Sequence, residues 1–263
     1  MFKVSCIQFT STKYIKKNLN ISKKLILKAI SQKSDFIITP ETSSLFGLNK
    51  NQLLKIATSM DKDIYLKEIK KIAKKYKKWI LTCVITKEKN KIKNRSVLIN
   101  SKGLVETYYD KIHMFDVKLS NKEKYYESKI FTAGKSLKTI NLPWGKLGLS
   151  VCYDLRFPNM FRKLGQKGAK FISVPSAFAE TTGKKHWHSL LKARAIENFC
   201  YIFAPAQYGT HWNKRKTYGH SLIVSPDGKI LKELKKGSGV ITAIIDPKIP
   251  TELRKKIPSL KKD

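Results

Sequence analysis

The fold class of the chain is decided by residues 147–175, which read LGLSVCYDLRFPNMFRKLGQKGAKFISVP. The apolar run 147–151 predicts a buried strand, and the segment 157–167, which ends before Gly168, predicts a helix. Residues 170–175 predict a second buried strand. Strands and helices that alternate around apolar strands are typical of a layered α/β domain, so this stretch predicts that fold class.

The same alternation continues on both sides of this stretch. We expect further helices at 18–32, 61–77 and 186–199. We expect further strands at 3–9, 36–39, 79–85, 95–100, 104–109, 200–206, 218–224, 229–234 and 239–245. Residues 111–136 show no clear period and are expected to form a long loop, of the kind that carries function. No linker or repeat interrupts the series, so we expect a single domain over residues 1–263.

The composition excludes a disordered chain, and its most unusual property is its charge. Of the 263 residues, 41% are hydrophobic, which is too many for disorder. Lys and Arg number 54 against 19 Asp and Glu, for a formal net charge of +35, and only six of the basic residues are Arg. Lys is scattered over most polar segments, so we expect a solvated surface and not a nucleic-acid site. Such a charge still attracts anionic ligands at long range.

The chain shows no signal for membrane insertion or export. No segment approaches the roughly 18 consecutive apolar residues of a membrane-spanning helix. The first residues, MFKVSCIQFT, lack the charged-then-apolar pattern of a signal peptide. The four cysteines form no Cys-x-x-Cys pair and are expected to be reduced thiols; they are Cys6, Cys83, Cys152 and Cys200. We therefore expect a cytoplasmic protein that does not bind membranes.

Three chemically reactive side chains share one kind of position. Glu41, Lys111 and Cys152 each stand at or just beyond the C-terminal end of an expected apolar strand. In open α/β sheets, ligands bind outside those strand ends. A thiolate could attack an amide-like carbon there, with the carboxylate as base and the ammonium stabilising the oxyanion. The alternative interpretation is a buried apolar cysteine, a glutamate that caps the next segment and one ordinary lysine.

Signatures of other enzyme classes are absent from the sequence. There is no GxSxG elbow, no HExxH zinc motif and no glycine-rich loop for nucleotide phosphates. His186 and His188 lie two residues apart, which points them to different faces of the expected helix. We therefore expect no metal site, and we interpret His113 and His220 as structural histidines.

The sequence around the three reactive residues resembles a known family. TPETSSLFG around Glu41, YYDKIHMFD around Lys111 and SVCYDLRFP around Cys152 resemble the catalytic blocks of the nitrilase superfamily of carbon–nitrogen hydrolases. The likeness continues through ESKIFTAG, VPSAFAETTGKKHWHSLLKARAIENFCY and QYGTHWNKRKTYGHSLIVSPDG, which begin at residues 127, 174 and 207. It covers nearly the whole chain in order, and these blocks are highly specific.

The resemblance implies an α-β-β-α sandwich with a Glu-Lys-Cys triad and no cofactor. On this basis Glu41 matches the general base, Lys111 the oxyanion stabiliser and Cys152 the nucleophile. Glu127 matches a second glutamate that holds the lysine, and the backbone N–H of Tyr153 matches the other oxyanion donor. The implied reaction passes through a thioester acyl-enzyme, releases ammonia and ends with hydrolysis by water.

Further short sequence segments narrow the range of substrates that the resemblance implies. CYDLRFP, PSAF, HW and KARAIEN resemble the branch that contains deaminated glutathione amidase and omega-amidase. True nitrilases typically carry a Trp-Glu pair after the nucleophile, whereas this chain has Tyr153 and Asp154. The resemblance therefore implies hydrolysis of a terminal carboxamide of a small acidic metabolite, with deaminated glutathione as the first choice.

Four residues are candidates for substrate binding. Arg156 could hold a substrate carboxylate in a forked contact, or it could form a structural salt bridge with Asp154 or another acid. Ser176, Phe178 and Thr182 follow an expected strand end, where they could form a pocket wall or simply pack in a loop.

Three functional hypotheses stay open from the sequence. The first is a deaminated-glutathione-type amidase, and the second is an omega-amidase or N-carbamoyl hydrolase of the same superfamily. The third is a non-catalytic basic scaffold that binds an acidic partner or nucleic acid. Members of the superfamily commonly associate through helices that correspond to residues 157–199, so the resemblance also implies a homo-oligomer, a dimer or higher.

Overall fold

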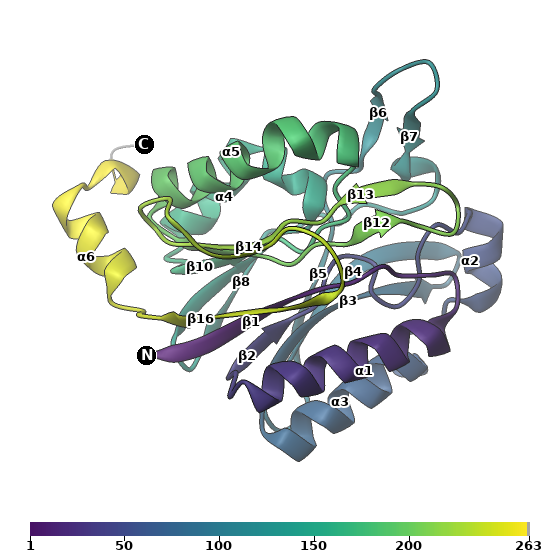
Figure 1. Cartoon of the computed structure of the whole chain (residues 1–263), viewed down its shortest axis with the longest axis horizontal. Helices are drawn as coiled ribbons and strands as arrows, with labels where there is room; N and C mark the ends of the chain where they lie inside the picture. The colour runs from purple at the N-terminus through teal and green to yellow at the C-terminus, as the bar shows by residue number, and fades with distance from the viewer. Residues whose placement is uncertain (262–263) are drawn as a thin grey trace.

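The computed structural model describes residues 1–261 and contains two six-stranded sheets that pack face to face (Figure 1). The first sheet has the spatial order β16 (Gly239–Ile245), β1 (Phe2–Gln8), β2 (Phe36–Ile38), β3 (Trp79–Glu88), β4 (Lys91–Ile99) and β5 (Val105–Asp110). The second has the order β15 (Ile230–Leu234), β14 (Ser221–Val224), β11 (Tyr201–Ala204), β10 (Phe171–Ser173), β9 (Gly145–Leu149) and β8 (Lys138–Leu142).

Helices cover the outer face of each sheet. Figure 1 shows α1 (Ile15–Ser31) and α3 (Ile64–Tyr76) against the first sheet, and α4 (Pro158–Gln166) and α5 (Glu180–Asn198) against the second. The buried residues of α3 recur every three or four positions, which gives this helix one apolar face toward the sheet. The four layers confirm the predicted α-β-β-α sandwich.

Aromatic side chains from both sheets meet in the core between them. The rings of Phe36 on β2 and Phe203 on β11 meet edge to face, with 6.3 Å between centroids. Phe2 on β1 and Phe171 on β10 meet in the same way at 5.3 Å. Burial of one such side chain contributes about 1.5–3 kcal/mol, and these contacts fix the separation of the two sheets.

The strands β2, β5 and β9 precede the three reactive residues along the chain and determine where these residues lie. In the first sheet, β2 is parallel to β1 and β3, and β5 runs in the same direction as β3 because β4 is antiparallel to both. In the second sheet, β9, β10 and β11 are parallel. The C-terminal ends of β2 and β5 therefore lie on the same edge of their sheet, as the prediction from strand ends requires.

The strand boundaries at 79–85 and 95–100 were predicted too short. β3 runs to Glu88 and β4 begins at Lys91, so the pair forms a long hairpin. Charged residues on β4 interrupt the apolar pattern from which a strand is predicted. The structure pairs them across the sheet with β5: Arg95 Nε lies 2.6 Å from Asp110 Oδ1, and Lys93 Nζ lies 3.7 Å from Asp110 Oδ2.

The prediction of a long loop over 111–136 was wrong in part. This segment contains the short hairpin of β6 (Asp116–Lys118) and β7 (Lys124–Tyr126), which projects from the body in Figure 1, and a 3₁₀ turn at Glu127–Lys129. Strands of three residues are too short to show a period of two, and for this reason the sequence does not reveal them.

Two helices and the start of a third were also missed. α2 (Lys50–Ile56) and α6 (Ile249–Lys256) are too short for a clear helical period, although Asn49 caps α2 in a capping box. α5 begins at Glu180 and not at 186, because its first turns carry Thr and Gly, which are weak helix formers. A ribbon of β12 (Tyr208–Thr210) and β13 (Lys216–Tyr218) completes the strands.

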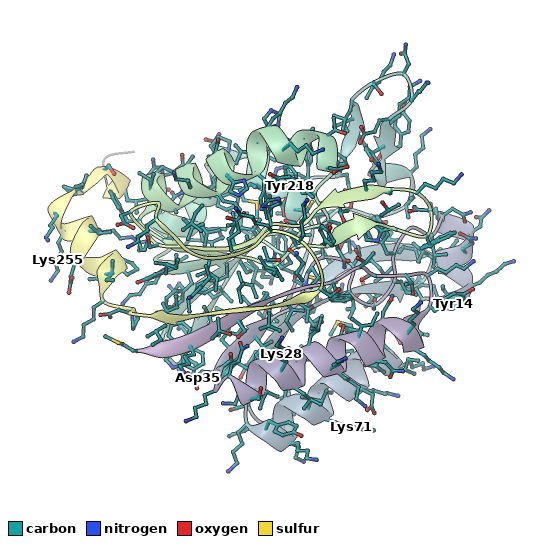
Figure 2. The ribbon with its side chains drawn as sticks, viewed as in Figure 1. Tyr14, Lys28, Asp35, Lys71, Tyr218 and Lys255 are labelled. Carbon is teal, nitrogen blue, oxygen red and sulfur yellow. The ribbon has the colours of Figure 1, made fainter. Side chains whose placement is uncertain are left out.

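The lysines that Figure 2 labels belong to different elements of the molecule. Lys28, Lys71 and Lys255 belong to α1, α3 and α6, and all three are exposed. This distribution fits the expectation of a solvated lysine-rich surface. Within residues 1–261, no helix is both long enough and apolar enough to cross a membrane.

Candidate active site

Glu41, Lys111 and Cys152 line one pocket, where the two sheets end. Glu41 lies three residues past β2, Lys111 directly follows β5, and Cys152 lies three residues past β9. Lys111 Nζ is 3.1 Å from Glu41 Oε1, and the Cys152 side chain forms a hydrogen bond with Glu41. The structure thus brings together the three residues that the sequence placed at strand ends.

The backbone at Cys152 is held in an unusual conformation. Its φ is +51°, a left-handed value that side chains other than Gly and Asn rarely adopt. The N–H of Cys152 donates to Pro175 O at 3.0 Å, and the buried Asp154 accepts a hydrogen bond from Val151 N–H at 2.9 Å. These contacts support a sharp turn between β9 and α4 that holds the thiol at the bottom of the pocket.

Glu41 is almost fully buried, at 3% exposure, and several donors contact its carboxylate. Besides Lys111, Asn94 Nδ2 donates to Oε1 at 2.8 Å and Ala177 N–H donates to Oε2 at 2.7 Å. Burial alone would raise the pKa of Glu41, but the charge of Lys111 and the hydrogen bonds from Cys152 and Lys111 outweigh it. The pKa therefore lies below its ordinary value, and Glu41 is ionised at neutral pH.

Lys111 is 2% exposed and lies between two carboxylates. Its Nζ is 2.6 Å from Glu127 Oε2, and Phe115 N–H holds the same oxygen at 2.7 Å. Burial alone would lower the pKa of Lys111, but Glu127 and then Glu41 outweigh it, so the pKa is raised. Lys111 is therefore a permanent buried cation, held by the two glutamates that the sequence singled out.

The thiol of Cys152 is protonated at rest. Burial raises its pKa and the charge of Glu41 raises it further, while Lys111 acts in the opposite direction. A thiol in this state becomes a nucleophile only when a base removes its proton, and Glu41 is hydrogen-bonded to it. The arrangement is chemically able to generate a thiolate beside a fixed positive charge.

The predicted substrate-binding residues do not all reach the pocket. Phe178 and Thr182 line it, as does Tyr153. Arg156 lies outside this lining, with Nη1 at 3.2 Å from Nδ1 of His186, and it makes no ion pair with Asp154 in the described part of the chain. Ser176 also lies outside, and its Oγ donates to Val174 O at 3.0 Å.

Sequence reasoning missed Arg215, the second cation of the pocket. Its Nη2 donates to Ala177 O at 2.9 Å, and its guanidinium lies 5.3 Å from the ring centroid of Phe46 and 4.8 Å from that of Tyr125. Its signal in the sequence was weak, although Arg is scarce in this lysine-rich chain. Asn94, which orients Glu41, lies inside a strand and gave no signal.

A histidine cluster lies apart from the pocket residues. His188 on α5 and His220 before β14 both contact Oε1 of Glu233 on β15, at 3.0 Å and 2.6 Å. The ligand atoms of His188, His220 and Glu233 lie within 4.8 Å of one another, a geometry able to hold a metal ion. The spacing of His186 and His188 in the sequence did not suggest this cluster. The contacts equally form a hydrogen-bond network, in which each imidazole has a partner.

Comparison with known proteins identifies the family. A family model described as carbon-nitrogen hydrolase matches residues 3–255. A deaminated glutathione amidase from Synechocystis is 36% identical over 262 residues, which are 97% of this chain and 96% of that protein. The NitFhit fusion protein from Caenorhabditis elegans is 35% identical over 260 residues, but the matched region spans 59% of its length.

Solved structures agree with these matches. The crystal structure of NitFhit has a TM-score of 0.93 at 34% identity and covers 100% of this chain and 65% of its own. Nit3 from Saccharomyces cerevisiae, described as a member of branch 10 of the nitrilase superfamily, has a TM-score of 0.87 at 27% identity and covers 98% of this chain and 94% of its own. The chain belongs to the carbon–nitrogen hydrolase family of the nitrilase superfamily and is an amidase-type hydrolase.

Proposed function

We propose that the protein hydrolyses an amide of a small acidic metabolite through a thioester at Cys152, and that the metabolite is deaminated glutathione. One observation carries the proposal: the thiol of Cys152, the base Glu41 and the buried cation Lys111 line a single pocket. The choice of substrate is supported by the similarity to relatives named deaminated glutathione amidase, at 34–38% identity.

The first half-reaction forms the acyl-enzyme. Glu41 takes the thiol proton as the sulfur of Cys152 attacks the amide carbon. Lys111 Nζ and the backbone N–H of Tyr153 stabilise the oxyanion of the tetrahedral intermediate. Glu41 then gives its proton to the leaving nitrogen, the C–N bond breaks, and the acyl group stays on Cys152 as a thioester.

The second half-reaction returns the enzyme to its starting state. Glu41 removes a proton from water, and the hydroxyl oxygen attacks the thioester carbon beside the same oxyanion donors. The C–S bond then breaks, the carboxylic acid leaves, and the thiol of Cys152 recovers the proton. Glu127 keeps Lys111 charged and in place through both steps, because it holds Nζ at 2.6 Å.

The leaving group depends on the substrate. A primary carboxamide releases ammonia, as the sequence analysis expected. Deaminated glutathione has only secondary amides, and hydrolysis of the amide of its 2-oxoglutaryl group yields 2-oxoglutarate and cysteinylglycine. The expected release of ammonia therefore does not apply to this substrate, and 2-oxoglutarate is the product to measure.

The test compares wild type with Cys152→Ala on deaminated glutathione, 2-oxoglutaramate, an N-carbamoyl amino acid and an aliphatic nitrile. We expect the fastest turnover with deaminated glutathione, with no turnover in Cys152→Ala and full activity in the control Cys200→Ala, whose thiol lies outside the pocket. Preference for 2-oxoglutaramate or the carbamoyl compound would keep the mechanism and replace the substrate by that of an omega-amidase or N-carbamoyl hydrolase. Equal activity of wild type and Cys152→Ala would contradict the mechanism.

A non-catalytic scaffold is the alternative from a different class, and no observation in the pocket favours it. We also propose a reducing compartment such as the cytoplasm, since all four cysteines are free and buried and catalysis needs the thiol of Cys152. The reaction proposed here requires no cofactor, because the described residues supply nucleophile, base and oxyanion donors.

A further inference from the structure

The pocket contains two cations, and they differ in their partners. Lys111 is held between Glu41 and Glu127, at 3.1 Å and 2.6 Å. Arg215 makes no ion pair with any acidic residue among residues 1–261. The positive charge of Arg215 therefore lies in a mostly apolar pocket with no acidic side chain in direct contact.

The guanidinium of Arg215 is held in place, but not all of its N–H groups have a hydrogen-bond partner. Nη2 donates to Ala177 O at 2.9 Å, and the rings of Phe46 and Tyr125 flank the group at 5.3 Å and 4.8 Å. Nε is buried, and no described residue accepts a hydrogen bond from it. A buried charged donor without a partner is unfavourable, and native structures satisfy most such groups with protein, water or ligand atoms.

Arg215 is also linked to the catalytic base. Its contact at Ala177 O lies on the same residue whose N–H donates to Glu41 Oε2 at 2.7 Å. A group bound to Arg215 is therefore held at a fixed position relative to Glu41 and the thiol of Cys152. This is the arrangement needed to place one end of a substrate while the other end reacts.

We propose that Arg215 binds a carboxylate of the substrate and makes the pocket selective for anionic amides, an inference that rests on the proposed function. A carboxylate accepts charge-assisted hydrogen bonds from a guanidinium, and Arg215 lines the pocket without an ion-pair partner among residues 1–261. A neutral amide leaves the charge of Arg215 without a direct partner, so a neutral amide binds more weakly than an anionic one. Arg215 takes the part that the sequence analysis considered for Arg156.

A purely structural role is the competing explanation. Arg215 precedes β13, and its bond to Ala177 O could simply fasten the β12–β13 ribbon to the second sheet. That role predicts equal effects of a substitution on charged and neutral substrates, whereas a carboxylate contact predicts a selective effect. The comparison of matched substrates therefore separates the two.

The test uses three amides of similar size. Glutaramate carries a carboxylate on the acyl side, N-pentanoylglycine carries it on the leaving side, and 5-methylhexanamide replaces the carboxylate of glutaramate by a neutral group of the same shape. The variants are Arg215→Met and Arg215→Lys, with Lys216→Met as a control that removes an exposed charge one residue away. Steady-state kcat and KM are measured for each pair.

We expect Arg215→Met to lower kcat/KM for one of the two anionic amides by about 100-fold, mainly through KM, and for the neutral amide by less than about threefold. The anionic substrate affected identifies the side of the amide that carries the carboxylate. Arg215→Lys should restore part of the loss, because it restores the charge but not the fork. Lys216→Met should leave all three values near those of wild type.

Equal losses on charged and neutral amides would overturn the inference and leave the proposed function intact. Binding provides a second measurement that does not need turnover. In a Cys152→Ala background, calorimetry should show that Arg215→Met weakens glutaramate or N-pentanoylglycine by at least about 30-fold. Unchanged affinity for both would also overturn it. Absence of any amide turnover in wild type would instead contradict the proposed function.

Discussion

Lys111 differs from the other lysines through its surroundings and not through its chemistry. It is 2% exposed and pairs with two carboxylates, whereas a lysine such as Lys71 pairs with Glu68 across a solvent-exposed helix face. Surface pairs of that kind contribute about 0–1 kcal/mol. A buried charge whose partner is removed costs about 3–5 kcal/mol, so Lys111 affects both activity and stability.

Lys111→Met should lower kcat by about 100- to 1000-fold, because one oxyanion donor is lost. It should also lower stability at neutral pH, because Glu41 and Glu127 then face each other unpaired. The pKa of Glu41 rises when the charge of Lys111 is lost, so protonation on acidification relieves the repulsion and stability is recovered as pH falls. Melting temperatures of variant and wild type at neutral pH and near pH 5 test this; a difference that grows at the lower pH would contradict it.

His211 should make the fold sensitive to acid. It is 2% exposed, with ring nitrogens 2.9 Å from Ser11 O and 2.8 Å from Thr217 Oγ1. Burial lowers its pKa from 6.5 to about 4, and the charge of Arg215 adds to the effect. Between these two pKa values the histidine binds a proton in the unfolded chain, whereas His211 stays neutral in the folded chain.

Stability should therefore be complete above about pH 6.5 and fall as the pH approaches 4, by up to about 3 kcal/mol from this group. Urea unfolding across this range should show a shallower pH dependence for His211→Gln than for wild type. If wild type and His211→Gln showed the same pH dependence of the free energy of unfolding, His211 would not be the cause of the acid sensitivity.

The sequence predicted Glu41, Lys111 and Cys152 because each follows an apolar strand and lies in a distinctive block of residues. It did not predict Arg215, because the importance of this residue arises from neighbours that are distant along the chain, above all Phe46 and Ala177. Arg156, four residues after Cys152, was close in sequence but turns toward His186. Proximity along the chain to Cys152 therefore did not indicate which arginine lines the pocket.

At the scale of the elements, α5 depends on a glycine that helix propensity alone would replace. A Cβ at Gly183 would lie 2.5 Å from side-chain atoms of Tyr218 on β13, closer than real contacts allow. Gly183→Ala gains about 1 kcal/mol of helix propensity but should lose more through the clash, for a net destabilisation of about 1–2 kcal/mol.

Chemical denaturation measures this change, with the exposed Lys185→Ala on the same helix as control. The control should be neutral within about 0.5 kcal/mol. A more stable Gly183→Ala variant would show that Tyr218 moves away freely and that the contact does not constrain α5.

Long apolar elements could be predicted from the sequence, and short or charged elements could not. The strands β1 and β16 and the helices α1 and α3 contain several apolar residues each, and their positions were confirmed. The ends of β3 and β4 nearest their turn were missed, because charge pairs between β4 and β5 replace apolar residues there. Pairing of this kind depends on the partner strand, which no local pattern reveals.

At the scale of the whole molecule, the net charge of +35 opposes self-association. We propose the homo-oligomer that the family resemblance implies, and we propose that residues 1–263 fold as one unit, since both sheets share a core. Because salt screens surface charges over about 8 Å at physiological ionic strength, the oligomer should be favoured by salt.

Sedimentation velocity at low and at physiological salt tests this prediction. We expect a shift toward monomer at low salt and toward dimer or larger species at physiological salt. A monomer under both conditions would contradict the proposed oligomer, and an oligomer unaffected by salt would show that its interface overcomes the repulsion.

The central claim is that catalysis passes through a thioester on Cys152. The most direct measurement is intact-protein mass spectrometry after an acid quench during turnover, followed by mapping of the modified peptide. We predict one 2-oxoglutaryl group on the peptide that contains Cys152, the same adduct from deaminated glutathione and from 2-oxoglutaramate, and none in Cys152→Ala. Turnover that continues in Cys152→Ala, or an acyl group on a different residue, would contradict the account.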